Sequence, residues 1–355
     1  MTTIDRAKPV FVSGANGYVA SWLVKKLLEE GLTVHAAVRN PENDKKVGHL
    51  KDIAKNTKGE LKLFKADLLT PNSYVEAMKG CELVYHTASP FTTNVKDPQK
   101  ELIEPAVKGT ENVLTTASQT PSVKRVVDTS SCAAIYTDAI DTVNAPKGIL
   151  TEEVWNKTAS LDYQPYSYSK TLAEKKAWEI ADAQNQWDLV TINMSMVMGP
   201  PLNPKATTSE SFNMLKQMGD GSLKSGAPKV GMGVVDVRDV AEAHYRAGFT
   251  PEASGRYITL GHNTNLFEMT QQLRPKFGQQ YPISKSAAPK WLLMFVGPMV
   301  NKNLTKKFIR NNVNVPFNAD NSKIKKDLGM TFIPLQKTME DSFQVLVDNG
   351  IFKTK

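Results

Sequence analysis

Cysteine and histidine are scarce in this sequence. Its 355 residues include two cysteines, Cys81 and Cys132, and five histidines. Two cysteines cannot build a disulfide framework or a zinc quartet, which favours a reducing compartment and a cytoplasmic protein. The histidines show no His-x-x-x-His or similar spacing, so we expect no metal site.

Long hydrophobic runs are also missing. The longest strongly apolar run covers residues 291–300 and is broken by Gly297 and Pro298. It reaches about half the ~20 residues of a membrane-spanning helix, so we expect a soluble protein with no membrane partner. Asp5, Arg6 and Lys8 stand where a signal peptide would have its apolar segment. The hydrophobic share of 41% and the charged share of 23% are typical of a globular chain.

Positive charge is concentrated in one segment. The chain has 44 lysines and arginines against 36 acids, a net charge of +8. Residues 285–326 contain nine of the basic residues and one acid, Asp320, so the two signs balance elsewhere. Such a segment can attract an anionic partner. Because no aromatic interleaving or nucleic-acid motif accompanies it, we expect a solvated surface and no nucleic-acid partner.

Short apolar runs alternate with helical patterns through the first half of the chain. The apolar and β-branched runs predict strands, and the spacing of apolar residues between them predicts helices. This alternation indicates βαβ units and an α/β fold with a doubly wound parallel (Rossmann) sheet. The expected strands are 10–12, 33–38, 61–66, 83–86, 126–131 and 189–194, and the expected helices are 18–30, 43–54, 71–78, 99–118 and 166–184.

The alternation is lost after residue 198, where three prolines, Pro200, Pro201 and Pro204, mark loop material. Two later segments, 234–249 and 256–260, still look like pieces associated with a sheet. An amphipathic helix is expected at 335–347. We therefore predict two domains. They are a nucleotide-binding Rossmann domain at 1–197, to which 233–262 returns, and a smaller, discontinuous C-terminal substrate-binding lobe at 198–232 and 263–355.

The first expected strand leads into a glycine-rich turn. Gly14, Gly17 and Ala20 form a Gly-x-x-Gly-x-x-Ala pattern that opens the next helix. Glycines permit a tight turn and close backbone approach, and the helix N-terminus offers free N–H groups to a pyrophosphate. The pattern is weak as a bare string, but its place in the first βα unit predicts a dinucleotide site.

The ends of the next strands indicate which dinucleotide is bound. An acid at the end of the second strand usually binds the ribose of NAD, but here Arg39 stands there, with Lys46 two turns on. A guanidinium at this place suits the 2′-phosphate of NADP(H). Asp67 ends the third strand, and it is either an adenine contact or an acid of a local turn. We interpret His86, at the end of the fourth strand, as a buried or cofactor-side residue.

Tyr166 and Lys170 form the best acid–base pair in the sequence. At i and i+4 of one expected helix, the ammonium lies beside the phenol and favours loss of its proton. A second match, Tyr281 and Lys285, lacks this context because Pro282 follows the tyrosine directly. A serine at the end of the fifth strand can hydrogen-bond a carbonyl oxygen as negative charge develops on it. This set predicts carbonyl reduction by hydride transfer, and the absence of Gly-x-Ser-x-Gly argues against a serine hydrolase.

On these motifs the chain resembles an extended short-chain dehydrogenase/reductase. Within that group it is similar to dihydroflavonol reductases, cinnamoyl-CoA reductases and yeast-type aldehyde (methylglyoxal) reductases. The tail after about residue 260 fits only loosely. The matching stretches are 13–21 (SGANGYVAS), 38–41 (VRNP), 65–68 (KADL), 86–90 (HTASP), 129–131 (TSS), 166–170 (YSYSK), 199–200 (GP), 235–241 (VDVRDVA) and 255–258 (GRYI).

The resemblance implies roles for individual residues. It makes Ser131, Tyr166 and Lys170 the catalytic triad, with Tyr166 as proton donor. It implies NADP(H) as the cofactor, and Tyr166 and Lys170 contact it too. The other implied cofactor residues are Gly14, Asn16, Gly17, Tyr18, Val19, Arg39, Lys46, Asp67, Leu68, Thr87, Ala88, Ser89 and Val197.

Three residues near the expected site depart from the family pattern. Tyr136 stands where the plant flavonoid enzymes carry a substrate-binding asparagine, which argues against a dihydroflavonol substrate. Met194 replaces a common proline. Asp128 lies in a strand that is usually apolar there, and the sequence offers no account of it.

The sequence favours a small-molecule carbonyl compound as the substrate, reduced to an alcohol by a monomer or homodimer. Apolar pocket walls indicate uncharged aliphatic or aryl carbonyl groups. An acyl-CoA ester remains an alternative, because the basic segment could hold its phosphates. A sugar-nucleotide epimerase or dehydratase and a redox-sensing dinucleotide binder are further alternatives. The expected walls are Phe91, Tyr136, Tyr163, Met198, Pro201, Leu202 and Phe212.

Overall fold

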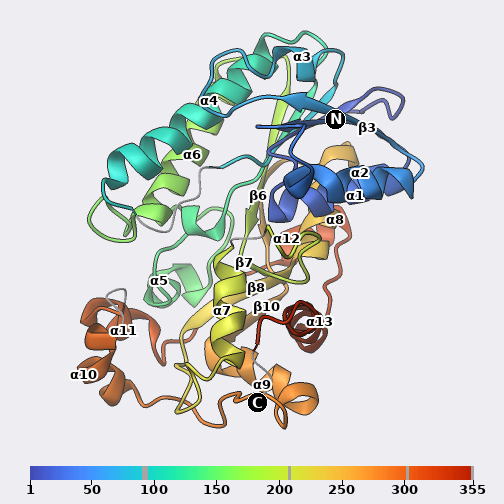
Figure 1. Ribbon diagram of the computed structural model, residues 1–355. Coiled ribbons are helices and arrows are strands. Elements are labelled where there is room, and N and C mark those ends of the chain that lie inside the picture. The colour runs from blue at the N-terminus through green and yellow to red at the C-terminus, as the bar shows by residue number, and fades with distance from the viewer. Residues whose placement is uncertain (90–94, 207–208, 301–303, 353–355) are drawn as a thin grey trace.

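Seven strands form one parallel sheet at the centre of the molecule (Figure 1). The structure is a computed structural model that describes residues 1–89, 95–206, 209–300 and 304–352. The strand order β3-β2-β1-β4-β5-β6-β9 reverses direction between β1 and β4, where a doubly wound sheet binds its ligand. The strands are β1 (Val10–Ser13), β2 (Thr33–Val38), β3 (Glu60–Lys65), β4 (Leu83–His86), β5 (Arg125–Asp128), β6 (Asp188–Met194) and β9 (Gly255–Thr259).

Helices cover both faces of this sheet. On one face α1 (Tyr18–Glu29) packs against α2 (Asp44–Lys55) and α8 (Val237–Phe249), and α12 (Ser322–Leu328) packs against α8. On the other face, α4 (Glu104–Ser118) lies along α6 (Pro165–Asp182), with α3 (Val75–Met78) beside α4 (Figure 1). Each face buries its own apolar cluster, so the expected Rossmann fold class is confirmed.

A second, three-stranded sheet lies beyond the carboxyl end of the large one. Its order is β10-β8-β7, with β7 (Met196–Met198) parallel and β10 (His262–Asn265) antiparallel to β8 (Gly231–Asp236). Around it lie α7 (Glu210–Gly219), α9 (Leu266–Phe277) and α13 (Leu335–Asp348). The remaining elements are η1 (Gln99–Ile103), η2 (Cys132–Ala134), α5 (Ile140–Asn144), η3 (Pro146–Gly148), α10 (Lys290–Val300) and α11 (Lys306–Asn312).

The chain leaves the large sheet and returns to it. It runs from β6 into β7 and β8 of the small sheet, then back through α8 to β9, which pairs with β6. Segment 234–249 is therefore a strand of the small sheet followed by a helix on the large one. The division into 1–197 with 233–262, and 198–232 with 263–355, stays a prediction.

Arg125 ties this returning segment to the sheet. Its guanidinium is fully buried and donates hydrogen bonds to both carboxylate oxygens of Asp188, at 2.7 and 2.9 Å. The same group also donates to backbone carbonyls at the end of α8 and just after it. Those carbonyls belong to Ala247, Thr250, Pro251 and Ala253.

Two expected helices differ from their observed form. Residues 71–78 contribute only the single turn α3, because Asn72 has a positive φ of 61° and breaks the helix before it. Residues 99–118 begin as the π-helical turn η1. Pro105 lacks the N–H that an α-helical hydrogen bond would need at that point. Among the described residues, no helix is both long and apolar enough to span a membrane.

Candidate active site and cofactor site

The glycine-rich turn leaves the start of α1 open to a ligand. Gly14 has φ +60°, and a Cβ there would lie 3.0 Å from the Ala88 backbone. Gly17 is the N-cap of α1 and provides no side-chain hydrogen bond to it. The first N–H groups of the helix therefore remain free to donate hydrogen bonds. Together with the positive end of the helix dipole, they fit a pyrophosphate.

A pocket of about 290 Å³ adjoins the turn. The side chains of Arg39 and Lys46 are exposed there, and no hydrogen bond or ion pair to another described residue occupies either. Two free cations beside the end of β2 suit a phosphate dianion. These residues fit the 2′-phosphate of NADP(H). The pocket is lined by Asn16, Val38, Arg39, Asn40, Asn43 and Lys46.

The end of β3 is held by local turn contacts. The Asp67 carboxylate accepts a hydrogen bond of 2.9 Å from the Leu69 N–H, as an acid of a turn does. The Leu68 carbonyl accepts from Asn112, and the Leu68 side chain packs beside Gly109 of α4. Contact between this segment and an adenine therefore stays a prediction.

Ser13, which the sequence did not single out, organises the loop after β4. Its hydroxyl oxygen accepts hydrogen bonds from the N–H groups of Thr87 and Ala88, each at 3.0 Å. Its own hydrogen is then left for Nδ1 of His86, 3.0 Å away. A small polar residue at the last position of β1 was the available signal.

Tyr166 lies in the first turn of α6 and Lys170 in the second. Tyr166 is 41% exposed, while Lys170 is 8% exposed, and its ammonium donates to the Ser89 hydroxyl at 3.1 Å. Ser131 follows β5 and forms a parallel bridge with Met194. The Ser131 hydroxyl accepts from the Ala133 N–H at 3.1 Å and remains part-exposed. An exposed phenol and a buried cation on α6, with a serine just after β5, can orient a carbonyl group and protonate it.

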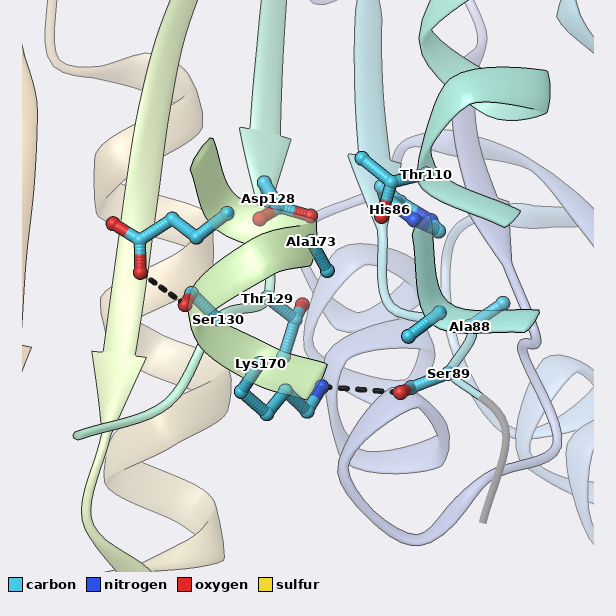
Figure 2. A pocket seen from close by; sticks show the side chains of 11 residues that line it. His86, Ala88, Ser89, Thr110, Asp128, Thr129, Ser130, Lys170 and Ala173 are labelled. Atoms are coloured by element: carbon cyan, nitrogen blue, oxygen red, sulfur yellow. Dashed lines mark hydrogen bonds between the residues drawn. The ribbon is translucent and has the colours of Figure 1, made fainter. Parts of the chain in front are cut away.

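A small cavity of about 20 Å³ lies behind Lys170 (Figure 2). His86 and Asp128 line it from β4 and β5, and Lys170 and Glu174 line it from α6. Burial, assisted by the Lys170 charge, lowers the pKa of His86 to about 3, so this histidine is neutral at physiological pH. Burial raises the pKa of Asp128 to about 7, although Lys170 opposes the shift.

Glu174 and Arg256 form a buried ion pair that sequence spacing could not reveal. The Arg256 Nε lies 2.6 Å from the Glu174 carboxylate, and Arg256 also stacks on Trp155. Asn193 donates to the same carboxylate at 2.6 Å, and Ser130 hydrogen-bonds it as well. This network joins α6, β5, β6 and β9 directly beneath the candidate triad.

The loop after β7 is fixed against α1. The Tyr18 hydroxyl donates to the Gly199 carbonyl at 2.7 Å, and Trp22 donates to the Pro200 carbonyl at 2.8 Å. Val197 packs with Val19 in one apolar cluster. The family motif at 199–200 is thereby held next to the glycine-rich turn.

The predicted substrate walls occupy different environments. Tyr136 packs on Phe317, and Tyr163 hydrogen-bonds Asp138 at 2.7 Å. The Lys307 ammonium lies 3.4 Å from the centre of the Tyr163 ring.

Met198 is buried and Phe212 half-buried in the apolar cluster around the small sheet. Pro201 and Leu202 are buried and half-buried in the loop that follows β7. Phe91 lies outside the described residues. The substrate wall assignments, like the catalytic and cofactor roles, stay predictions.

Two further expectations concern sites elsewhere. Tyr281, the second Tyr-x-x-x-Lys match, packs on Phe277, Phe343 and Phe352 in the apolar cluster around the small sheet. In the described part of the chain, no cluster of three or more His, Cys, Asp or Glu residues could hold a metal ion.

Comparison with known proteins gives consistent matches over the whole chain. Residues 10–261 match the model of the NAD dependent epimerase/dehydratase family. A cinnamoyl-CoA reductase of Medicago truncatula (CAD2) is 37% identical over 98% of both chains. Tetraketide alpha-pyrone reductase 1 of Arabidopsis thaliana is 36% identical over 99% of both. The solved structure of yeast methylglyoxal/isovaleraldehyde reductase Gre2 with NADPH is 28% identical. It superposes with a TM-score of 0.77 over 96% of this chain and 99% of that one.

Proposed function

The chain belongs to the NAD dependent epimerase/dehydratase family, of the extended short-chain dehydrogenase/reductase type, and we propose that it reduces aldehydes or ketones to alcohols with NADPH. It is an oxidoreductase, and its cofactor is NADP(H). The observation that carries the finer proposal is the pairing of the exposed Tyr166 with the buried Lys170, one turn apart on α6.

Each residue of the site has a defined task in this reaction. The N–H groups at the start of α1 bind the pyrophosphate, and Arg39 and Lys46 bind the 2′-phosphate. The bound cofactor supplies a hydride to the carbonyl carbon. The Ser131 hydroxyl orients the carbonyl oxygen, and Tyr166 gives it a proton. The charge of Lys170 favours that transfer, and Ser89 holds Lys170 in place.

A second candidate function is the reduction of an acyl-CoA ester to an aldehyde. The similarity to cinnamoyl-CoA reductase supports it, and so does the position of Lys307 over Tyr163. Lys306 and Lys307 are exposed on α11, where they could bind the phosphates of CoA. The epimerase or dehydratase alternative is weaker. Dehydratases of this type carry an acid pair after the fifth strand, where this chain has Cys132 and Ala133.

The experiment is an NADPH-oxidation screen of the purified protein. Aldehydes, ketones, 1,2-diketones, a dihydroflavonol and cinnamoyl-CoA are compared under identical conditions. We expect the highest kcat/KM with an uncharged aldehyde or ketone. Preference for cinnamoyl-CoA, lost on replacing Lys306 and Lys307 by alanine, would overturn this and establish the second candidate. The matched control replaces Lys325 and Lys326, two lysines of α12 in the same basic segment.

A further inference from the structure

Asp128 is the one residue of the cavity that the sequence could not explain. It is the last residue of β5 and the register partner of His86 in β4, so both side chains point to the same face of the sheet. That face is covered by α4 and α6 (Figure 2). Asp128 is only 6% exposed. Its carboxyl group therefore lies inside the protein, behind Lys170.

The Asp128 carboxyl group has no hydrogen-bond donor among the described residues. Two other buried acids are ion-paired, Glu174 with Arg256 and Asp236 with Arg238. A third, Asp239, accepts a hydrogen bond from a backbone N–H. An unpaired buried carboxyl group lowers the stability of the fold. Its presence in a native protein therefore calls for an explanation, and a functional role is one. The space in front of it, about 20 Å³, is large enough for one water molecule.

The groups around this space can exchange protons with such a water. Nδ1 of His86 accepts from Ser13, so its neutral ring carries its proton on Nε2. Lys170 and Glu174 are the other titratable groups on the cavity, both from α6, whereas α4 contributes Ala106 and Thr110. Glu174 is already engaged by Arg256 and Asn193. Asp128 is thus the acid of this cavity that no described side chain engages.

On these grounds we propose that Asp128 is a positioning and proton-relay residue, which restores through Lys170 the proton that Tyr166 loses in each turnover. The proposal rests on the proposed reductase function. Lys170 passes one proton toward the tyrosinate and becomes neutral. The Asp128 carboxylic acid then passes one through the cavity water to Lys170 and becomes a carboxylate. Solvent returns a proton to Asp128, so one proton from solvent is consumed per alcohol formed.

The electrostatics of the site are consistent with this task. Burial raises the pKa of Asp128 to about 7, with Lys170 lowering and Glu174 raising it. A relay acid works best when its pKa lies near the working pH, because it must both give and regain a proton. In the wild type we therefore expect kcat to fall as pH rises through about 7.

The test compares Asp128→Asn, which keeps the shape and loses the proton, with Asp239→Asn. Asp239 is also buried with a pKa raised to about 7, but it lies on α8 and accepts from Ile333. We expect Asp128→Asn to lower kcat roughly 10- to 100-fold, with KM and NADPH affinity unchanged. The inflection of kcat near neutral pH should vanish, and the solvent deuterium isotope effect should rise. Asp239→Asn should change none of these.

A second readout needs neither cofactor nor turnover. Infrared spectra of cofactor-free Asp239→Asn protein should show a protonated carboxyl band that titrates near pH 7, and this band should be absent when Asp128→Asn is added to the same protein. If the band is missing in the first protein, or if Asp128→Asn keeps the wild-type kcat, pH profile and isotope effect, the relay is wrong. Wild-type protein without turnover on any compound of the screen overturns the proposed function and the relay together.

Discussion

The ammonium of Lys170 donates a hydrogen bond of 3.1 Å to the hydroxyl of Ser89. This contact joins the second turn of α6 to the loop that follows β4 at the carboxyl edge of the sheet. Because Lys170 is buried and Tyr166 is exposed one turn earlier, the cation is fixed beneath the phenol. The position of the Lys170 ammonium thus depends on a residue of the loop after β4.

Replacing Tyr166 by phenylalanine should abolish most turnover. The ring is kept and only the hydroxyl is lost, so fold and NADPH affinity should be retained while kcat falls by roughly 10²–10⁴. Steady-state kinetics and fluorescence titration of NADPH measure the two effects. Tyr281→Phe, within the aromatic cluster of the second lobe, is the control and should be active. Near-normal turnover of Tyr166→Phe would sink the triad assignment.

Ser89→Ala removes the hydrogen-bond acceptor of Lys170. Such a bond to a charged group is worth about 1.5–3 kcal/mol, so we expect kcat/KM to fall by roughly 10-fold or more. Ser89→Thr retains a hydroxyl and should restore most of the activity. If alanine and threonine variants behave alike, the hydroxyl does not orient Lys170.

Arg39→Glu should weaken the preference for NADPH over NADH. The substitution removes one charge-assisted contact to the 2′-phosphate and adds repulsion. The ratio of the affinity for NADPH to that for NADH should therefore fall roughly 10- to 150-fold. Dissociation constants for both cofactors, measured by titration, give that ratio. Lys45→Glu makes the same charge change at a neighbour that does not line the pocket, and it should shift the ratio far less. An unaltered ratio in Arg39→Glu would leave Arg39 as a surface residue.

Asp239→Asn should stabilise the protein above neutral pH. Burial raises the pKa of Asp239 to about 7, above its unfolded value of 3.8, so the folded wild type binds the extra proton between these pH values. The contribution of Asp239 to the free energy of unfolding of the wild type is therefore largest below pH 4. It is lost as the pH rises to about 7.

Between about pH 4 and pH 7, the free energy of unfolding of the variant should rise relative to that of the wild type by up to about 1.4 kcal/mol per pH unit. Urea unfolding at several pH values measures this difference. Burial also lowers the pKa of His244 to about 4. Its titration changes the free energy of unfolding of wild type and variant equally, so it does not affect the difference between them. A difference that does not grow with pH would contradict the assignment.

The sequence predicted the parts of the fold that depend on neighbours along the chain. Strands 33–38 and 83–86 have the expected bounds because their runs of apolar and β-branched residues are bounded by turn residues. The family and the Rossmann class, read from Gly14, Gly17 and the Tyr166–Lys170 pair, are confirmed.

Contacts between distant segments could not be predicted in this way. The pairing of Glu174 with Arg256 and the position of Lys307 over Tyr163 depend on how the two sheets are placed, which no local spacing encodes. Asp128 looked anomalous in a strand of apolar residues. Only the register with His86 shows that it faces a polar cavity rather than the core.

The return of the chain from the small sheet to β9 also sets an order for its synthesis on the ribosome. Until residues 255–259 emerge, β6 has an unpaired edge, which is a template for wrong pairing with other chains. The guanidinium of Arg125 likewise has no backbone acceptors until the carbonyl groups of residues 247–253 have been synthesised. A nascent chain that stalls just after β7 therefore exposes an unpaired strand edge, and Arg125 is paired with Asp188 but still lacks its backbone acceptors.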